Sequence, residues 1–336
     1  MTAIWNKLRW PFKALIIAAP IILLGYFAME NGWMSDKGQG VAQTPATTQA
    51  GTADAAGQPE AKPAASGRTF AYQPARPVDG QLKGVVEVGA TGFNSFVVNM
   101  DAQRRWEIVS KDFGQSLAYE GMATTEDIRS GLKRYISSMF EKGVKSRDVH
   151  FVISSGAQKN PKTQAISDEL RKMGFVVNLV TPEQEGQLAL RAALPADYQG
   201  SAFVADIGSG NTKVSWMSQG GGVTSVEAPG SKYFEKDLPD GAVYSEVKDK
   251  ASRVPAGNRS VCFIIGGTPY ELAKQGRNGD ERYTVLADPA SYAADKPKTK
   301  AGLNIYKALK DATGCDTFVF DWDANFTIGF LLQLKQ

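Results

Sequence analysis

The feature that most constrains this chain is a short apolar strand that runs into a glycine-rich turn. Residues 205–213 read ADIGSGNTK, so an acid stands near the strand end and a second strand begins after the turn. Gly208 and Gly210 lack Cβ atoms, which lets backbone N–H groups approach an oxyanion closely, and Asp206 is placed to hold a cation or a metal-bound water. The pattern predicts a phosphate-binding hairpin. An ordinary β-hairpin with a Gly, Ser and Asn turn is the alternative.

Composition limits the classes of function. The chain has 336 residues, 43% of them hydrophobic, which is enough for two domains with a sizeable core. Its net charge of +3 predicts no strongly basic face, so nucleic acid is not an expected partner. The only histidine, His150, precedes an apolar run and is expected to begin a strand, which argues against histidine-based triads and zinc sites.

The two cysteines, Cys262 and Cys315, each border a strand-like run. Buried thiols are the favoured interpretation, because cysteine is among the most buried residue types. A single disulfide between them is the alternative that the sequence leaves open.

The N-terminal segment predicts a membrane anchor. Residues 1–13 carry Lys7, Arg9 and Lys13 without an acid, and residues 14–29 carry no charge. We expect a transmembrane helix over 14–34, and the positive-inside rule places 1–13 in the cytoplasm and the folded part in the periplasm of a bacterial inner-membrane protein. A cleaved signal peptide is the alternative, but bulky Tyr26 occupies a position where its cleavage site needs a small residue.

Residues 35–80 are rich in Ala, Gly, Thr, Gln and Pro and are predicted to form a flexible, disordered linker. Ordered structure is expected to begin near Leu82. From there the hydrophobic pattern predicts the order β-β-β-α-β-α-β-α, and the same order begins again at Ser201. A loop-rich section is expected at 229–260, and no element or function is assigned to the segment 276–300. The fold class is therefore α/β, with duplicated lobes at 81–200 and 201–336 and a central cleft.

Four motifs in this order resemble the exopolyphosphatase and guanosine pentaphosphate phosphohydrolase (Ppx/GppA) family of the actin-like ATPase superfamily. That family has D-x-G-S-N-S-F, E-E-A, D-I-G-G-G-S-T-E and G-G-T segments. The matching segments here are 87–89 with 94–96, 184–186, 206–212 and 266–268. The resemblance covers residues 82–336 and implies two ribonuclease-H-like lobes.

The resemblance also implies hydrolysis of a phosphoanhydride, such as polyphosphate or guanosine pentaphosphate, with a divalent metal such as Mg²⁺. Glu185 matches the catalytic glutamate, while Asp206 and Glu87 match the acids near the metal and the attacking water. From the residues alone, Glu185 stands in the first turn of a helix, where a carboxylate can also serve simply to stabilise that helix. The expected phosphate contacts are Gly89, Asn94, Ser95, Lys159, Gly208, Ser209, Gly210, Asn211, Thr212, Gly266, Gly267 and Thr268.

Several departures from the family pattern bear on activity. Glu87 replaces an aspartate, and residues 90–93 lengthen the first loop. Lys159 stands near the position of a phosphate-binding arginine and supplies a point charge without a bidentate fork.

The departures leave two functions open: a membrane-anchored phosphohydrolase, or a catalytically impaired domain that binds a phosphate ligand or serves as a scaffold in a cell-envelope assembly. The anchor makes the membrane a partner, and an envelope protein or a second copy of the chain remains open as a further partner.

Overall fold

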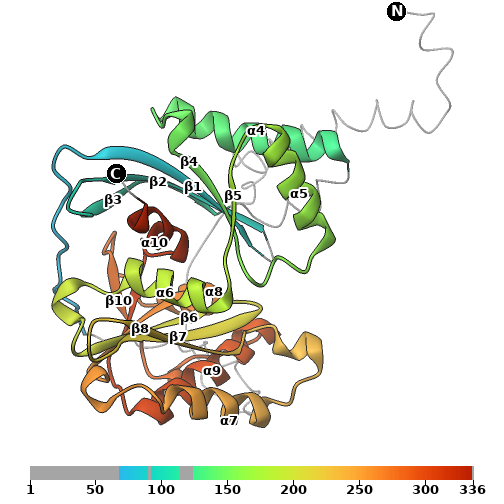
Figure 1. The fold of residues 1–336 in the computed structure, drawn as a ribbon. Coiled ribbons are helices and arrows are strands. Elements are labelled where there is room, and N and C mark those ends of the chain that lie inside the picture. Colours follow the sequence, from blue (N-terminus) through green and yellow to red (C-terminus); the bar gives the residue numbers. More distant parts are fainter. Residues whose placement is uncertain (1–67, 90–91, 114–123, 335–336) are drawn as a thin grey trace, which may run out of the picture. The chain divides into compact units, whose positions relative to one another are not determined.

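A computed structural model describes residues 68–89, 92–113 and 124–334 (Figure 1). Contacts divide the chain into Met1–Pro59 and Glu60–Gln336, and every described residue belongs to the second unit. The expected transmembrane segment 14–34 and most of the expected linker lie outside the described residues. Within the described ranges, no helix has the length and hydrophobicity needed to cross a bilayer.

The first sheet joins three antiparallel strands to two parallel ones in the order β3-β2-β1-β4-β5. Most of β1 and β4 is buried, which explains why their sequences read as nearly continuous apolar runs. His150 lies in β4, as predicted. The strands are β1 (Gln81–Gly89), β2 (Gly92–Met100), β3 (Trp106–Phe113), β4 (Val149–Ile153) and β5 (Val177–Leu179).

The second sheet has the order β10-β11-β9-β6-β7-β8. Without β10 its order repeats that of the first sheet, so the two-lobed α/β fold expected from the recurring sequence pattern is confirmed. The strands are β6 (Ala202–Ile207), β7 (Asn211–Met217), β8 (Val223–Pro229), β9 (Val261–Gly266), β10 (Tyr283–Val285) and β11 (Phe318–Asp321).

Helices cover both faces of each sheet (Figure 1). One core lies between the first sheet and the helices α4 and α5, and another lies between the second sheet and α7, α8 and α9. A third core joins both sheets through α6 and α10. The helices are α4 (Thr125–Glu141), α5 (Pro161–Lys172), α6 (Pro182–Ala193), α7 (Asp240–Ala251), α8 (Gly267–Ala273), α9 (Pro297–Thr313) and α10 (Phe326–Gln333).

The helix α6 begins at the predicted capping box. The Thr181 hydroxyl accepts a hydrogen bond from the Gln184 backbone N–H at 3.2 Å, and the Gln184 side chain accepts one from the Thr181 N–H at 2.9 Å. Pro182 occupies the first helical position, where a missing N–H costs no hydrogen bond. These local signals fix the N-terminus of the helix that carries Glu185.

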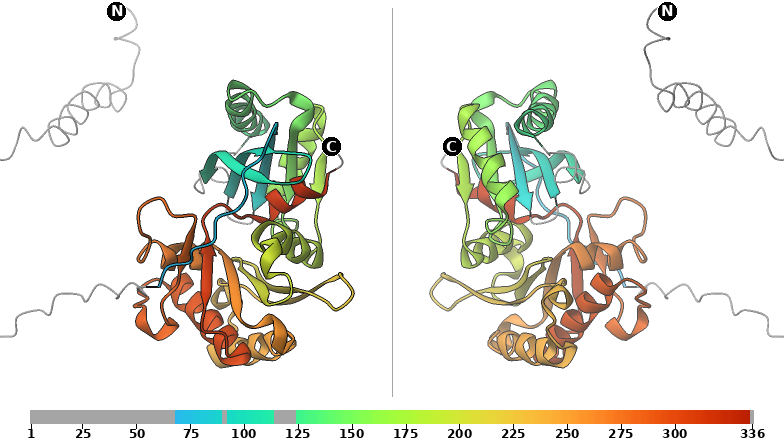
Figure 2. Two further views of the ribbon diagram at one scale, coloured as in Figure 1. Left: turned by 90° about the vertical axis from the view of Figure 1, so that its left-hand side faces the viewer. Right: turned by 90° about the vertical axis from the view of Figure 1, so that its right-hand side faces the viewer.

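The helices α6 and α10 connect the two lobes. Although α6 comes from the segment expected to form the first lobe, it packs on β7 and β8, and α10 packs on α6 and β1 (Figure 2). Two glycines allow these close contacts: a Cβ on Gly186 would lie 1.9 Å from the Ser225 hydroxyl, and one on Gly329 would lie 1.9 Å from the Leu188 carbonyl oxygen.

Several elements lie where loops or linker were expected. The helix α7 lies within 229–260, and its buried residues Val243, Val247 and Ala251 have the spacing of one helix face, a signal that the glycines and prolines of this section obscure. The strand β10 lies in the segment 276–300, for which no element was predicted, because its three residues are too few for a periodicity signal. Phe70, from the expected linker 35–80, packs against Phe263 and Tyr283 of the second lobe and against Tyr198, just before that lobe begins.

Candidate functional site

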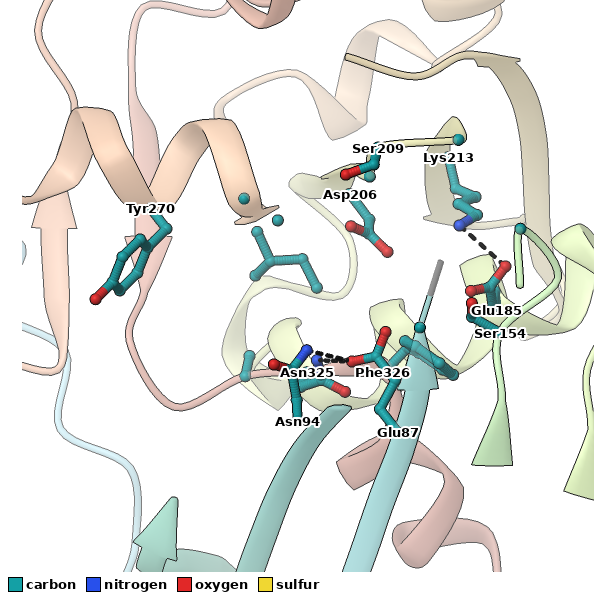
Figure 3. Close-up of a pocket in the computed structure, with 18 of the residues that line it drawn as sticks. Glu87, Asn94, Ser154, Glu185, Asp206, Ser209, Lys213, Tyr270, Asn325 and Phe326 are labelled. Carbon is teal, nitrogen blue, oxygen red and sulfur yellow. Dashed lines mark hydrogen bonds and ion pairs between the residues drawn. The ribbon is translucent and has the colours of Figure 1, made fainter. Parts of the chain in front are cut away.

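The ends of strands from both sheets meet around a cavity of about 330 Å³. The first sheet contributes the β1–β2 end, and the second contributes the β6–β7 turn and the end of β9. Most of the residues predicted for the site line this cavity (Figure 3). They are Glu87, Gly89, Asn94, Glu185, Asp206, Gly208, Ser209, Gly210, Asn211, Gly266 and Gly267.

Glu87 is held at one wall by two amides. It lies directly opposite Asn94 in the β1–β2 pair, and the Nδ2 atoms of Asn94 and Asn325 donate to its Oε2 at 2.8 and 3.1 Å (Figure 3). Burial raises the pKa of Glu87 to about 7 despite these hydrogen bonds. Near neutral pH this carboxyl can therefore carry or release a proton.

Glu185 is bound on the opposite wall by a lysine. The Nζ atom of Lys213 lies 3.0 Å from Glu185 Oε2 (Figure 3). The Ser155 hydroxyl donates to the same oxygen. Both charged side chains are almost completely buried, with 4% exposure for Lys213 and 3% for Glu185. A buried pair of this kind holds both groups in place, because removing either partner would leave an uncompensated charge.

Asp206 lies at the end of β6, directly opposite Lys213 in β7, and points into the same cavity (Figure 3). Burial raises the pKa of this carboxyl, although the nearby Lys213 ammonium opposes the shift. None of the described residues forms a hydrogen bond to its side chain. Asp206 therefore offers an unsatisfied carboxylate to a ligand or to a water.

The glycine-rich turn is a tight β6–β7 hairpin. The Gly208 N–H donates to the Asn211 carbonyl at 3.0 Å, and the Asn211 amide donates to Ser155 Oγ at 3.2 Å and to Glu227 Oε1 at 2.8 Å. The hydrogen bond to Ser155 connects the turn to the loop after β4. Gly266 has φ +109°, and a Cβ there would lie 2.3 Å from the Ile207 carbonyl oxygen, so this close approach requires glycine.

Four predicted phosphate contacts do not line the cavity. Lys159 is exposed on the loop after β4. Ser95 follows Asn94 in β2, so its side chain lies on the opposite face of the sheet. The Thr212 hydroxyl is buried and donates to the Pro229 carbonyl at 2.9 Å, while Thr268 is buried against Gly302.

The structure adds residues that sequence reasoning missed. Lys213 stands where the D-I-G-G-G-S-T-E motif has its final glutamate, so the motif comparison itself contained the signal. Asn325, which caps α10, reaches Glu87 from 238 positions away, and no local pattern predicts such a contact. Lys298 and Tyr270 line the other end of the cavity.

The side chains present do not fit the divalent cation that the resemblance implies. An ammonium already lies among the acids expected to hold it: Lys213 contacts Glu185 and interacts electrostatically with Asp206 and Glu87. Lys213 occupies an oxygen of Glu185 and offsets part of the negative charge that a divalent cation would need. Throughout 68–89, 92–113 and 124–334, no three His, Cys, Asp or Glu side chains are grouped as metal ligands.

Comparisons with known proteins establish the fold. No protein-family model matches the chain. No curated protein matches it either. Among solved structures, a Ppx/GppA phosphatase from Aquifex aeolicus has 16% identity and a TM-score of 0.55, with 75% of this chain and 98% of that chain covered. An exopolyphosphatase from Cytophaga hutchinsonii has 14% identity and a TM-score of 0.57, with coverage of 75% and 96%.

Proposed function

We propose that this protein, which has the fold of the Ppx/GppA phosphatases, binds a phosphoanhydride in the cleft and hydrolyses its terminal phosphate. The supporting observation is the meeting of glycine-rich turns and three carboxylates, Glu87, Glu185 and Asp206, at one cavity. Backbone N–H groups of the turn at 208–211 are suited to phosphate oxygens, and the carboxylates are suited to a water.

In the proposed reaction a water oxygen attacks the terminal phosphorus. The P–O bond to the bridging oxygen breaks, and the bonding electrons leave with the shortened phosphate chain. Glu185 accepts the proton of the water, as the family resemblance implies. Turnover is expected to be slow, because Lys213 and Ser155 both engage the Oε2 atom of Glu185 and compete with the water for it.

The same pair of contacts favours a second candidate function. A glutamate held by a buried ion pair is stable without a substrate, which suits a domain that binds a phosphate ligand without turnover. We propose this binding role, as part of a cell-envelope assembly, as the alternative to hydrolysis.

The N-terminal sequence supports a proposed location. We propose that residues 14–34 anchor the chain in a bacterial inner membrane, with the folded lobes in the periplasm. Nucleotides are cytoplasmic, so this placement favours polyphosphate over guanosine pentaphosphate as the ligand. Separation of cells into membrane and soluble fractions, with protease added to intact spheroplasts, tests both the anchor and its orientation.

Phosphate release by the full-length protein tests the hydrolase. Polyphosphate, guanosine pentaphosphate and ATP are supplied in turn, each with magnesium and with a chelator. We expect release from polyphosphate, and we expect Glu185→Gln to slow it by about 100-fold or more, the usual contribution of a catalytic base. Glu183→Gln, an exposed neighbour in the first turn of the same helix, serves as the matched control and should leave the rate unchanged.

Equal release by the Glu185→Gln variant would exclude Glu185 as the base. A folded protein that binds polyphosphate without releasing phosphate would establish the second candidate. A folded protein that does neither would contradict both.

A further inference from the structure

We infer that Lys213 is the built-in cation of this cleft and binds phosphate oxygens directly, so that the ligand binds without a divalent metal. The inference rests on the proposed binding of a phosphate ligand. Lys213 would be the positively charged group that binds this ligand, and the fold alone does not identify that group.

The position of Lys213 follows from the hairpin that holds the glycine-rich turn. Lys213 and Asp206 are directly opposite in the antiparallel β6–β7 pair, so both side chains lie on the same face of the sheet. That face meets the cavity, which both residues line. The ammonium is thus fixed by two paired strands beside the turn expected to hold phosphate.

The surroundings keep Lys213 charged. Burial alone would favour a neutral amine, but Asp206 and Glu185 outweigh it and raise the pKa of the Lys213 ammonium, with a smaller contribution from Glu87. The close packing of α6 at Gly186 holds Glu185 against β7, so the Glu185 carboxylate stays beside the Lys213 ammonium. A lysine that stays protonated inside a cleft acts as a fixed positive point charge.

The ammonium has donors to spare for a ligand. A lysine carries three N–H donors, and the ion pair with Glu185 Oε2 at 3.0 Å engages one of them. Within the described part of the chain, Lys213 makes no other hydrogen bond. Two N–H donors remain on the side chain that lines the cavity, and an ionised phosphate oxygen can accept a charge-assisted hydrogen bond from them.

A second lysine, Lys298, also lines the cavity. It lies near the start of α9, beside Gly267. Burial and the neighbouring Lys232 lower its pKa, so its charge is held less firmly than that of Lys213. The firmly held cation of the cleft is therefore Lys213.

Calorimetric titration of the full-length protein with tripolyphosphate, in EDTA and in magnesium, tests the inference. We expect equal affinity in the two buffers. Lys213→Met should weaken binding by about 10- to 100-fold, the value of a charge-assisted hydrogen bond, and Lys213→Arg should retain most of it. Lys236→Met, which removes an exposed lysine, is the matched control and should bind like the wild type.

Lys213→Met leaves Glu185 unpaired in a buried site and can prevent folding. The double variant Lys213→Met/Glu185→Gln therefore separates loss of binding from loss of folding. It removes both charges, should fold, and should also bind weakly. Binding that needs magnesium, or that survives in the folded double variant, would overturn the role of Lys213 while the proposed ligand class stands. Absence of binding in both buffers would overturn the ligand class together with this inference.

Discussion

The Glu87 carboxyl is an acid whose protonation is shifted by its place in the fold. It lies at the end of β1, with two amides from β2 and the cap of α10 on one oxygen. Burial raises its pKa from 4.5 to about 7. The two carboxylates nearby, Glu185 and Asp206, add to the shift.

This shift predicts a pH dependence of stability. Below pH 4.5 Glu87 is protonated in both the folded and the unfolded states. Between 4.5 and about 7 only the folded protein keeps the proton, so the free energy of unfolding falls as pH rises through this window. One proton sets an upper limit to the slope of about 1.4 kcal/mol per pH unit.

Urea unfolding at a series of pH values measures this slope. Glu87→Gln, which keeps an oxygen that can accept both amide hydrogen bonds, should remove its contribution. Glu246→Gln, an exposed carboxylate on α7, should leave the profile as in the wild type. Identical slopes for the wild type and the Glu87→Gln variant would contradict the assignment.

At the same scale, the sequence predicted residue identities better than their environments. The motifs indicated Glu87, Glu185 and Asp206, and all three line one cavity. The ion pair between Glu185 and Lys213 was not predicted, because it depends on α6 packing against β7. A motif gives the order of chemical groups along the chain, whereas their pairing is a property of tertiary packing.

The helix α6 illustrates how one element positions the site. It carries Glu185 at its N-terminal turn and lies so close to β7 and β8 that Gly186 has no room for a side chain. The hydroxyls of Ser215 and Ser225, which are hydrogen-bonded at 2.9 Å, lie directly beneath it. This close packing brings Glu185 within reach of Lys213.

Gly186→Ala should therefore destabilise the protein by about 1–3 kcal/mol, as overpacking does in other cores. It should also weaken tripolyphosphate binding, because α6 must move away from β7. Gly241→Ala in α7, where an added Cβ meets no atom within 4 Å, is the matched control and should be neutral or stabilising by up to about 1 kcal/mol. Denaturant unfolding curves of both variants provide the measurement, and equal stabilities would show that α6 has room to adjust.

Residues close in sequence predicted where a helix begins, but they did not predict which strands it packs against. The Thr181 capping box and Pro182 predicted the start of α6 from four residues. Which sheet α6 covers depends on Ser225, far along the chain, whose contact with Gly186 no periodicity encodes.

On the scale of the whole folded unit, the segment before β1 stabilises the lobe that follows later in the sequence. Phe70 lies 5.5–5.6 Å, between ring centroids, from Tyr198, Phe263 and Tyr283. The packed part of the chain thus includes residues of the expected linker. The sequence did not predict this packing, because Phe70 is one aromatic residue near the end of a stretch rich in Ala, Gly and Pro.

Phe70→Ala should lower the free energy of unfolding by about 2 kcal/mol, a moderate value because the ring is only partly buried. Val78→Ala, at a residue of the same segment that is 57% exposed, should change the free energy of unfolding by less than about 0.5 kcal/mol. Thermal and urea unfolding of the two variants distinguish a packed segment from a tether, since loss of a tether residue would leave both midpoints unchanged.

The repeated strand order could be predicted from the sequence, because each lobe recreates the same alternation of apolar runs and turns. The sequence did not predict that α6 packs on the second sheet and α10 on the first, because the repeat assigns each helix to its own half. The most sequence-distant elements, β1 and α10, are neighbours in the structure.

This neighbourhood determines when the protein can fold during its synthesis. The strand β1 leaves the ribosome long before the helix that covers its inner face, Phe326–Gln333. N-terminal domains usually fold while synthesis continues. Here the apolar inner face of the first lobe stays uncovered until α10 has been made, so a chain truncated before Phe326 presents that face to chaperones and proteases.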